Sequence, residues 1–531
     1  PTVTVSSLYD NSGAEYDMKP KQFAKDYKKS YSLGEGPGAD FSFSPSDDGP
    51  AIFSSFVLSS VKFKKKKNEI TFTVVPHVVV ALSGLVPDTG ECELVFDTAC
   101  VAPPPPEPLA CERYSDEART PDGLCVARYA GGADGADGAA SWLGEPRGLL
   151  CNTETRGHLL AVDRLDGRIW ALRDLDGDGN IAPSTSEAVV LAQQDGLNHG
   201  LAMFGGYLYA SSSDVVWRWA WDPATWRGGP IPGSPEAVIR NMDATSAPGP
   251  GGGLSSPNGH VTRTLEFDLW GRLYVSVGSV GNVDNNSFRA RIRRFTNLQN
   301  AQDLPVDFTT GEVFADGLRN EVGLAWPDPD KTVLYGVENG MDNLYRGDLG
   351  GDIHIDNPGE ELNRFPIDEP GNHYGYPWCW SEYKLEHPDA GGKGTQWALM
   401  LGRWDDPPDD AHCRDPTKTV PPVASFQAHS APLGIAFYGT DWPDTDCAGT
   451  AVGLPCEYWG DAFIGFHGSW NRQPPTGYKV VRVPFDRAAQ APVDPAADPE
   501  DFVWADPGPR WSTGLRPVDV AFSRAGELFF S

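Results

Sequence analysis

A short strand motif recurs six times after residue 160, and it constrains the fold more than any other feature of the chain. Each copy begins with a turn residue, usually Gly, followed by apolar or aromatic residues, as in GRLYVS at 271–276. Several copies follow a second apolar strand four to nine residues upstream. Two adjacent strands repeated six times describe the inner strands of β-propeller blades. The sequence therefore predicts an all-β, six-bladed β-propeller, with an irregular β-sandwich as the alternative. The copies lie at residues 167–171, 206–211, 271–276, 332–337, 461–465 and 526–531.

Two features of the spacing qualify this prediction. A long insertion, at about residues 370–428, is expected between the fourth and fifth copies. The sequence stops at Ser531, directly after the last copy. A sixth blade therefore needs strands from elsewhere, and the segment after Cys111 is a candidate.

A sharp change in composition divides the chain near residue 101. Residues 1–100 contain 10 Lys, no Arg and no Trp, whereas residues 101–531 contain 5 Lys, 28 Arg and all 17 Trp. The tract APPPPEP at 102–108 is typical of a stiff polyproline spacer. We predict a β-rich N-terminal domain of unknown role at residues 1–101, a linker at 102–110 and the propeller at 111–531.

The net charge is −30, from 43 basic and 73 acidic residues. This balance argues against a nucleic-acid partner or an anionic membrane surface. The longest apolar run, 70–86, is interrupted by Pro76, His77 and Gly84, so no membrane insertion is expected.

The nine cysteines form no CxxC zinc pattern, and their loose spacing is typical of a secreted protein with disulfides. Cys379–Cys413 and Cys447–Cys456 are plausible pairs, and the odd count leaves one cysteine free or paired elsewhere. The sequon at 285–287 is weak support for an extracellular location.

Polar residues precede the first inner strand of each repeat. Because the inner strands of a propeller start at one mouth of its channel, we expect these residues to converge on one ring. Several Arg side chains in a channel of low dielectric constant require an anion, and a flat poly-carboxylate suits their forked geometry. The residues are Arg147, Asn198, His199, His260, Arg263, Arg319, Asn320, His429 and Arg516.

Two turns suggest calcium. Backbone carbonyls near Gly340 and Met341 suit a hard cation. The segment 174–181 (DLDGDGNI) matches the first eight positions of a calcium loop through Asp174, Asp176 and Asp178. Its twelfth position is Thr185 rather than Glu, so the alternative is an acidic hairpin turn.

Seven stretches together carry a resemblance: GLNHGLAM, HVTRTLEFDLWGRLYVSVGS, DGLRNEVGLAW, ENGMDNL, DNPGEELN, HYGYPWCWSEY and FHGSWNRQPPTGYKVVRVPF. From about Cys111 onward the chain resembles the soluble quinoprotein sugar dehydrogenases, most closely the fungal pyranose dehydrogenases. The resemblance implies a six-bladed propeller that binds pyrroloquinoline quinone (PQQ) and Ca²⁺ at its channel mouth, and it implies a sugar substrate.

The resemblance also implies roles for individual residues. His260 resembles the general base that takes the sugar hydroxyl proton while a hydride passes to the quinone, and Arg319 resembles the residue that stabilises charge on the quinone oxygen. Asn320 resembles the neighbouring contact to the cofactor. The carbonyls of Gly340 and Met341 resemble the Ca²⁺ ligands. Arg472 and Arg516 occupy places where the family grips PQQ carboxylates.

The chain departs from the family pattern at two places. The glucose dehydrogenases place Asp before the base, where this chain has Gly259, so the group that orients His260 is not evident. Pro517 and Val518 follow Arg516, where those enzymes show a second Arg.

Three functions are compatible with these features. The first is PQQ- and Ca²⁺-dependent oxidation of a sugar. The second is a catalytically inactive propeller that serves as an extracellular binding or structural module, against which the joint presence of His260, Arg319 and Asn320 argues. The third, a calcium-dependent lactonase, ranks last because it needs several carboxylates around one metal. The motifs specify neither the sugar nor the electron acceptor.

Overall fold

The computed structural model divides the chain into two compact units, Pro1–Glu107 and Pro108–Ser531. In the first unit it describes four strands only, which form one antiparallel sheet in the order β1-β4-β3-β2. Their bounds are β1 (Thr2–Val5), β2 (Ala39–Ser42), β3 (Phe53–Lys64) and β4 (Glu69–Pro76). In the second unit it describes residues 115–131, 142–155, 157–175, 177–181, 186–222, 229–242, 259–284, 288–298, 304–400, 407–441 and 453–531.

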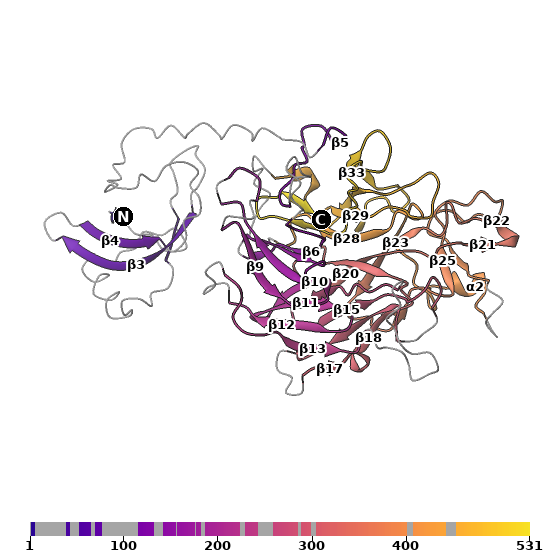
Figure 1. Ribbon diagram of the computed structural model, residues 1–531, viewed down its shortest axis with the longest axis horizontal. Helices are drawn as coiled ribbons and strands as arrows, with labels where there is room; N and C mark the ends of the chain where they lie inside the picture. The colour runs from indigo at the N-terminus through magenta and orange to yellow at the C-terminus, as the bar shows by residue number, and fades with distance from the viewer. Residues whose placement is uncertain are drawn as a thin grey trace. The chain divides into compact units, whose positions relative to one another are not determined.

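The second unit is a β-propeller with five blades, each a sheet of four or five strands (Figure 1). Blade one is β6 (Pro146–Leu150), β7 (Leu159–Asp163), β8 (Arg168–Leu172) and β9 (Ala188–Gln193). Blade two is β10 (Leu197–Phe204), β11 (Tyr207–Ser212), β12 (Val216–Ala220) and β13 (Glu236–Arg240), with β17 (Val306–Asp307) at its edge. Blade three is β14 (Leu265–Phe267), β15 (Leu273–Val277), β16 (Arg291–Phe295) and β18 (Glu312–Asp316), with β24 (Asn372–His373) at its edge. Blade four is β19 (Glu321–Ala325), β20 (Val333–Glu338), β23 (Glu360–Pro366) and β27 (Ala424–Phe426). Blade five is β28 (Pro432–Phe437), β29 (Ala462–Phe466), β30 (Lys479–Val483) and β33 (Glu500–Ala505), with β5 (Ala118–Arg119) at its edge.

The prediction of a complete sixth blade is wrong. The last repeat forms a sheet of only two strands, β34 (Val520–Phe522) and β35 (Leu528–Phe530). Strand β34 contacts β28 on one side and β6 on the other, so the first strands of all six repeats still form a closed ring. The segment after Cys111 does not complete this sheet, because β5 pairs with β33 of blade five.

A ladder of aromatic contacts explains the repeated sequence motif. Tyr209, Tyr274 and Tyr335 occupy the same position in three copies, and all three are fully buried. Each ring packs against an aromatic residue at the end of the next blade's first strand. The ring centroids are 4.9 Å apart for Tyr209–Phe267, 5.6 Å for Tyr274–Trp326 and 5.8 Å for Tyr335–Phe437. Phe463 makes the corresponding contact with Phe522 of the two-stranded sheet, at 5.3 Å. The aromatic residue of the motif therefore packs against the next blade as well as within its own blade.

The long insertion lies within blade four, between β23 and β27, rather than between two blades. It contributes β24 to blade three and a separate sheet of β25 (Cys379–Ser381) and β26 (Gln396–Ala398). The short helix α2 (Asp410–Cys413) ends at the Cys379–Cys413 disulfide, which confirms that predicted pair. Smaller two-stranded sheets are β21 (Tyr345–Arg346) with β22 (Gly351–Asp352) and β31 (Phe485–Asp486) with β32 (Ala491–Pro492). The short 3-10 helices are η1 (Thr153–Thr155), η3 (Phe308–Thr310), η4 (Gly347–Leu349) and η5 (Cys456–Tyr458).

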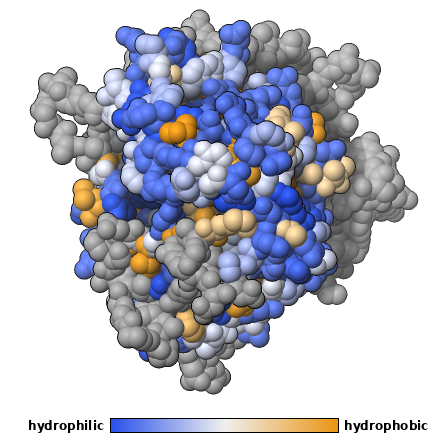
Figure 2. All heavy atoms as spheres, turned by 90° about the vertical axis from the view of Figure 1, so that its right-hand side faces the viewer, coloured by the Kyte–Doolittle hydropathy of each residue, from blue (hydrophilic) through white to orange (hydrophobic). Residues whose placement is uncertain are grey.

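Other cysteines are only partly accounted for. Cys456 is disulfide-bonded, but Cys447 lies outside the described residues, so the predicted pair between them stays a prediction. Cys151 is a free, buried thiol. In the described part of the chain, no helix combines the length and apolar character needed to cross a membrane. Figure 2 shows the face that carries β21 and β22, which is mostly hydrophilic with small, separate apolar groups.

Candidate active site

His260 lies just before β14, at the start of an innermost strand. Its Nδ1 is 2.8 Å from the backbone carbonyl oxygen of Ser279 and 3.1 Å from the Ser279 hydroxyl. A carbonyl only accepts hydrogen bonds, so Nδ1 carries the proton and Nε2 keeps its lone pair. No group among the described residues hydrogen-bonds to Nε2. His260 is therefore arranged as an open base.

Ser279 is the orienting group that the sequence did not reveal. Its carbonyl accepts both the backbone N–H of His260, at 3.0 Å, and the ring Nδ1–H. Its own N–H donates to the carbonyl of Arg319 at 2.7 Å, which ties the predicted base to the predicted charge-stabilising residue. The Ser279 hydroxyl donates to the carbonyl of Gly281, which leaves its oxygen free to accept from the ring.

Burial and the nearby charge of Arg319 lower the pKa of His260 to about 3. A lone carboxylate beside Nδ1 would raise this pKa, but a carbonyl carries no charge. The ring is therefore neutral at physiological pH. A neutral imidazole can accept a proton, whereas an imidazolium cannot.

Arg319 lies between β18 and β19, and its guanidinium is held by several acceptors. It donates to the Asp342 carboxylate at 3.2 Å, to the Asn282 carbonyl and side-chain oxygens at 3.3 Å, and to the Asn339 carbonyl at 3.2 Å. Its backbone N–H donates to the carboxylate of Glu338, which is buried. The positive charge of Arg319 is thus both buried and fixed in direction.

Asp342 is the hub of this arrangement. One carboxylate oxygen contacts Arg319, and the other accepts from Asn471 at 2.8 Å and lies 3.5 Å from His429 Nδ1. Burial alone raises the pKa of Asp342, but the hydrogen bonds from His429 and Asn471 and the charge of Arg319 outweigh it and bring the pKa below its usual value. The sequence motifs did not single out Asn282 or Asn471, because they reach Asp342 from distant turns.

The turn at Gly340 and Met341 is the first of the two predicted calcium sites. The N–H of Gly340 donates to Glu360 at 2.7 Å. The carbonyl oxygens of Gly340 and Met341 accept no hydrogen bond from the described residues. The Met341 side chain is buried among aromatic residues of the insertion, including Trp380 and Trp397. The insertion therefore fixes a turn whose oxygens are free for a hard cation.

A second group of residues around the channel consists of Arg147, His199, His467 and Arg516, and we call it the cationic cluster because of its two arginines. The Nε–H of Arg147 and Nδ1 of His199 are buried and have no hydrogen-bond partner among the described residues. Burial, together with the charge of Arg147, lowers the pKa of His199 to about 3. Burial, with Arg516 and Arg147, lowers the pKa of His467 to about 4. Arg516 donates to the carbonyls of His467 at 3.0 Å and Gly468 at 2.7 Å. The buried Nε–H of Arg147 has no partner among the described residues, and the charges of Arg147 and Arg516 both act on His467, so the cluster fits an anionic ligand.

Comparison with known proteins identifies the family. The family described as TrAA12-like matches residues 135–531. The chain belongs to the TrAA12-like family.

Three relatives illustrate what this TrAA12-like chain is similar to. It is 32% identical over 372 residues to a pyrroloquinoline quinone-dependent pyranose dehydrogenase of Coprinopsis cinerea, covering 66% of this chain and 44% of that protein. It is 30% identical over 407 residues to a pyrroloquinoline quinone-dependent sugar dehydrogenase of Hypocrea jecorina (strain QM6a), covering 73% of this chain and 83% of that protein. The holo form of the PQQ domain of pyranose dehydrogenase from Coprinopsis cinerea superposes with a TM-score of 0.61 at 28% identity, covering 80% of this chain and 96% of that chain. The chain spans less than half the length of the Coprinopsis cinerea relative.

Four predicted cofactor contacts of the TrAA12-like chain have partners within the protein. Asn198 of blade two donates to the carbonyl of Val261, just before the first strand of blade three, at 2.8 Å. Asn320 donates to Asn339 at 2.8 Å. The remaining two are arginines. Arg263 donates to the carbonyls of Ser213, His260 and Thr262, and Arg472 donates to Ile355, Pro474 and Asp356. These contacts hold the walls of the site together, and a direct role of the four residues with PQQ stays a prediction.

The second predicted calcium segment forms a tight turn. Both carboxylate oxygens of Asp174 accept backbone N–H groups, from Gly177 at 2.6 Å and Gly179 at 2.8 Å. Asp178 accepts the N–H of Asn180 at 2.8 Å, and Asp176 lies outside the described residues. Where the chain is described, no three His, Cys, Asp or Glu residues are grouped to hold a metal. A calcium ion here stays a prediction beside the acidic-turn alternative.

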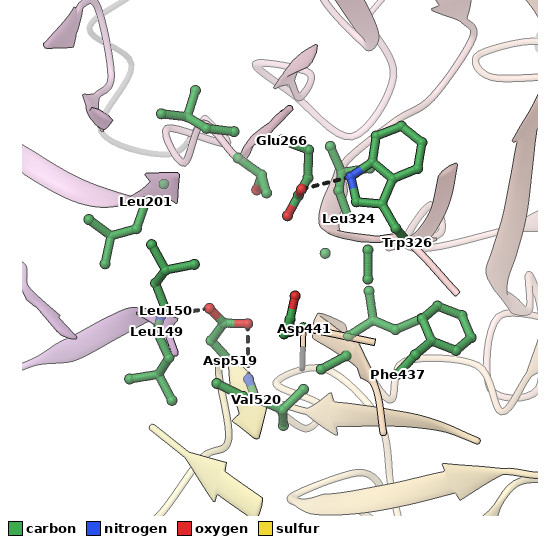
Figure 3. Close-up of a pocket in the computed structure, with 18 of the residues that line it drawn as sticks. Leu149, Leu150, Leu201, Glu266, Leu324, Trp326, Phe437, Asp441, Asp519 and Val520 are labelled. Carbon is green, nitrogen blue, oxygen red and sulfur yellow. Dashed lines mark hydrogen bonds between the residues drawn. The ribbon is translucent and has the colours of Figure 1, made fainter. Parts of the chain in front are cut away.

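Deeper in the channel lies a cavity of about 80 Å³. Figure 3 shows the carboxylates of Glu266, Asp441 and Asp519 pointing into it. Burial raises the pKa of Glu266 to about 7 and that of Asp519 to about 6. Glu266 accepts from the Trp326 indole at 2.9 Å, and Asp519 accepts from the N–H of Leu149 at 2.8 Å. The latter bond links the two-stranded sheet to blade one and helps to close the ring.

Proposed function

We propose that this chain oxidises a sugar, namely a pyranose or a related aldose or ketoaldose, with PQQ and Ca²⁺ as cofactors. The observation that carries the proposal is the pairing of an open, oriented base with a buried, oriented cation. His260 and Arg319 are joined through Ser279, so both are fixed relative to one another. The family relationship and the PQQ-dependent relatives support the choice of cofactor.

Side-chain and backbone groups at the mouth fit both cofactors. PQQ is a tricarboxylate. Arg147 Nε–H and His199 Nδ1, both without a partner among the described residues, suit its carboxylates when Nδ1 carries the ring proton. The free carbonyls of Gly340 and Met341 suit Ca²⁺. When bound, PQQ supplies a two-electron acceptor and Ca²⁺ supplies a Lewis acid.

Within this arrangement the chain moves a proton and stabilises charge. His260 Nε2 accepts the proton of the sugar hydroxyl, because Ser279 holds the opposite ring nitrogen protonated. Arg319 presents a fixed positive charge where negative charge develops during the reaction, and it needs no reorganisation because Asp342 and Asn282 already hold it. We also propose an extracellular location, which the Cys379–Cys413 disulfide supports.

The test is sugar oxidation with an artificial dye as electron acceptor, after incubation with PQQ and Ca²⁺. We expect wild-type turnover with at least one pyranose or ketoaldose, and a loss of about 10²- to 10⁴-fold in kcat for His260→Ala. PQQ affinity, followed by the quinone absorbance, should be retained in that variant. Unchanged turnover in His260→Ala would sink the assignment of the base. If the wild-type protein takes up no quinone, the inactive binding module becomes the better description.

A further inference from the structure

Trp470 is an exposed aromatic residue in a segment that also contains the buried residues Ser469 and Arg472. Its side chain is 72% exposed, whereas Ser469 is 2% and Arg472 is 7% exposed. Single exposed hydrophobic residues are common on protein surfaces and need no explanation by themselves. Two further observations distinguish Trp470 from such residues.

The first observation is the anchoring of the segment on both sides of Trp470. The N–H of Ser469 donates to the Thr476 carbonyl at 2.9 Å, and the Ser469 hydroxyl accepts from the Thr476 N–H at 3.1 Å. Arg472 donates to the Ile355 carbonyl at 2.9 Å and to the Asp356 carboxylate at 2.9 Å. The backbone that presents the indole is therefore held in place, although the indole itself is solvent-exposed.

The second observation is the position of the segment between the two groups of site residues. On one side, the carbonyls of His467 and Gly468 accept from Arg516 of the cationic cluster. On the other side, Asn471 donates to Asp342, the partner of Arg319. Trp470 thus borders the mouth where the base and both cofactor sites are proposed to lie.

We propose that Trp470 is a stacking surface for the pyranose ring of the substrate, an inference that rests on the proposed function. The C–H face of a sugar ring is apolar, and an aromatic ring offers a large, rigid surface with few rotatable bonds. The indole binds the sugar beside His260 and exchanges no proton.

The test compares Trp470→Ala and Trp470→Phe in the protein loaded with PQQ and Ca²⁺. Trp470→Ala should raise KM for the pyranose about five- to tenfold, with kcat changed less than about twofold, and Trp470→Phe should recover most of the loss. PQQ affinity should stay at the wild-type value in both variants.

Trp270→Ala is the matched control. Trp270 is 63% exposed, but it lies in the turn after β14, at the other end of that strand from His260, and packs against Arg272. Its substitution should leave KM unchanged. Equal KM values for Trp470→Ala and Trp270→Ala would overturn the proposal, and so would weakened PQQ binding with an unchanged KM, since Trp470 would then cover the cofactor.

Failure of the proposed function is distinguishable from failure of this inference. If the wild-type protein oxidises no sugar, saturation-transfer NMR with a free pyranose still reports whether the sugar contacts the protein. Loss of that signal in Trp470→Ala and not in Trp270→Ala would support the stacking surface without any turnover. A signal equal in both variants would contradict it.

Discussion

The two charged groups at the mouth of this propeller differ in how completely the protein satisfies them. Around Arg319, nearly every donor has an acceptor, and Asp342 receives hydrogen bonds on both oxygens. Around Arg147, a buried Nε–H has no partner among the described residues, and the charge of Arg147 acts on His199 and His467. The first group is complete without a ligand, whereas the second is not.

This difference indicates two separate tasks for the Arg and His residues around the channel, namely catalysis and retention of the cofactor. Catalytic charges act best when they are fixed before the substrate arrives, because no reorganisation is then needed. A binding site for an anionic cofactor needs hydrogen-bond donors that are not already paired within the protein. The Arg319 group thus suits the reaction itself, and the cationic cluster suits retention of the cofactor.

Substitution of Arg319 should have the largest effect on both stability and turnover. Arg319→Met leaves the half-buried Asp342 carboxylate with only His429 and Asn471 beside it. We expect a loss of about 2–4 kcal/mol in the free energy of unfolding, measured by urea denaturation without cofactor. We also expect kcat to fall about 10²- to 10³-fold. Wild-type stability in Arg319→Met would show that the contacts between Arg319 and Asp342 do not stabilise the protein before the cofactor binds.

Substitution of Arg147 should separate cofactor binding from stability. Arg147→Met removes a buried donor that has no partner, so the free energy of unfolding should change by less than about 1 kcal/mol. The dissociation constant for PQQ should rise about ten- to hundredfold, because a charged hydrogen bond to a carboxylate is lost. Arg164→Met is the control, since Arg164 pairs with Glu145 at 2.8 Å and is half-exposed. Equal PQQ affinities in the two variants would remove Arg147 from the cofactor site.

The sequence predicted those parts of the molecule that repeat. The recurring tyrosines predicted the propeller because each one packs against the next blade in the same way. The number of blades was wrong because the last repeat has only two strands and β5 joins blade five. Ser279 was missed because it orients His260 chiefly through its backbone carbonyl, which any residue type carries. Whether Arg472 contacts PQQ could not be judged from a motif, since its partners, such as Asp356, come from another blade.

The pH dependence of stability tests the cationic cluster in a different way. The pKa of His199 is lowered from its ordinary value of 6.5 to about 3 by burial and by Arg147, so the unfolded chain takes up the proton first. Stability is therefore full above about pH 6.5 and is lost as the pH falls toward 3, with about 2 kcal/mol lost between pH 7 and pH 5. His199→Gln should remove this part of the loss in urea denaturation at the two pH values. Bound PQQ should also reduce it, because its carboxylates favour the charged ring. An unchanged loss in His199→Gln would assign the acid sensitivity to other histidines.

The smallest expected effect concerns Ser279, which belongs to the satisfied group. Because the carbonyl of Ser279 holds Nδ1–H of His260 and its hydroxyl only assists, Ser279→Ala should lower kcat less than about threefold. Ser279→Asp should place a carboxylate beside Nδ1 and raise the pKa of His260, so that kcat begins to fall at a higher pH as the solution is acidified, by about one pH unit or more. Ser279→Asn has the same shape without the charge and should leave the pH profile in place. If Ser279→Asn moved the profile as far as Ser279→Asp, a change of shape rather than of charge would be responsible for the shift.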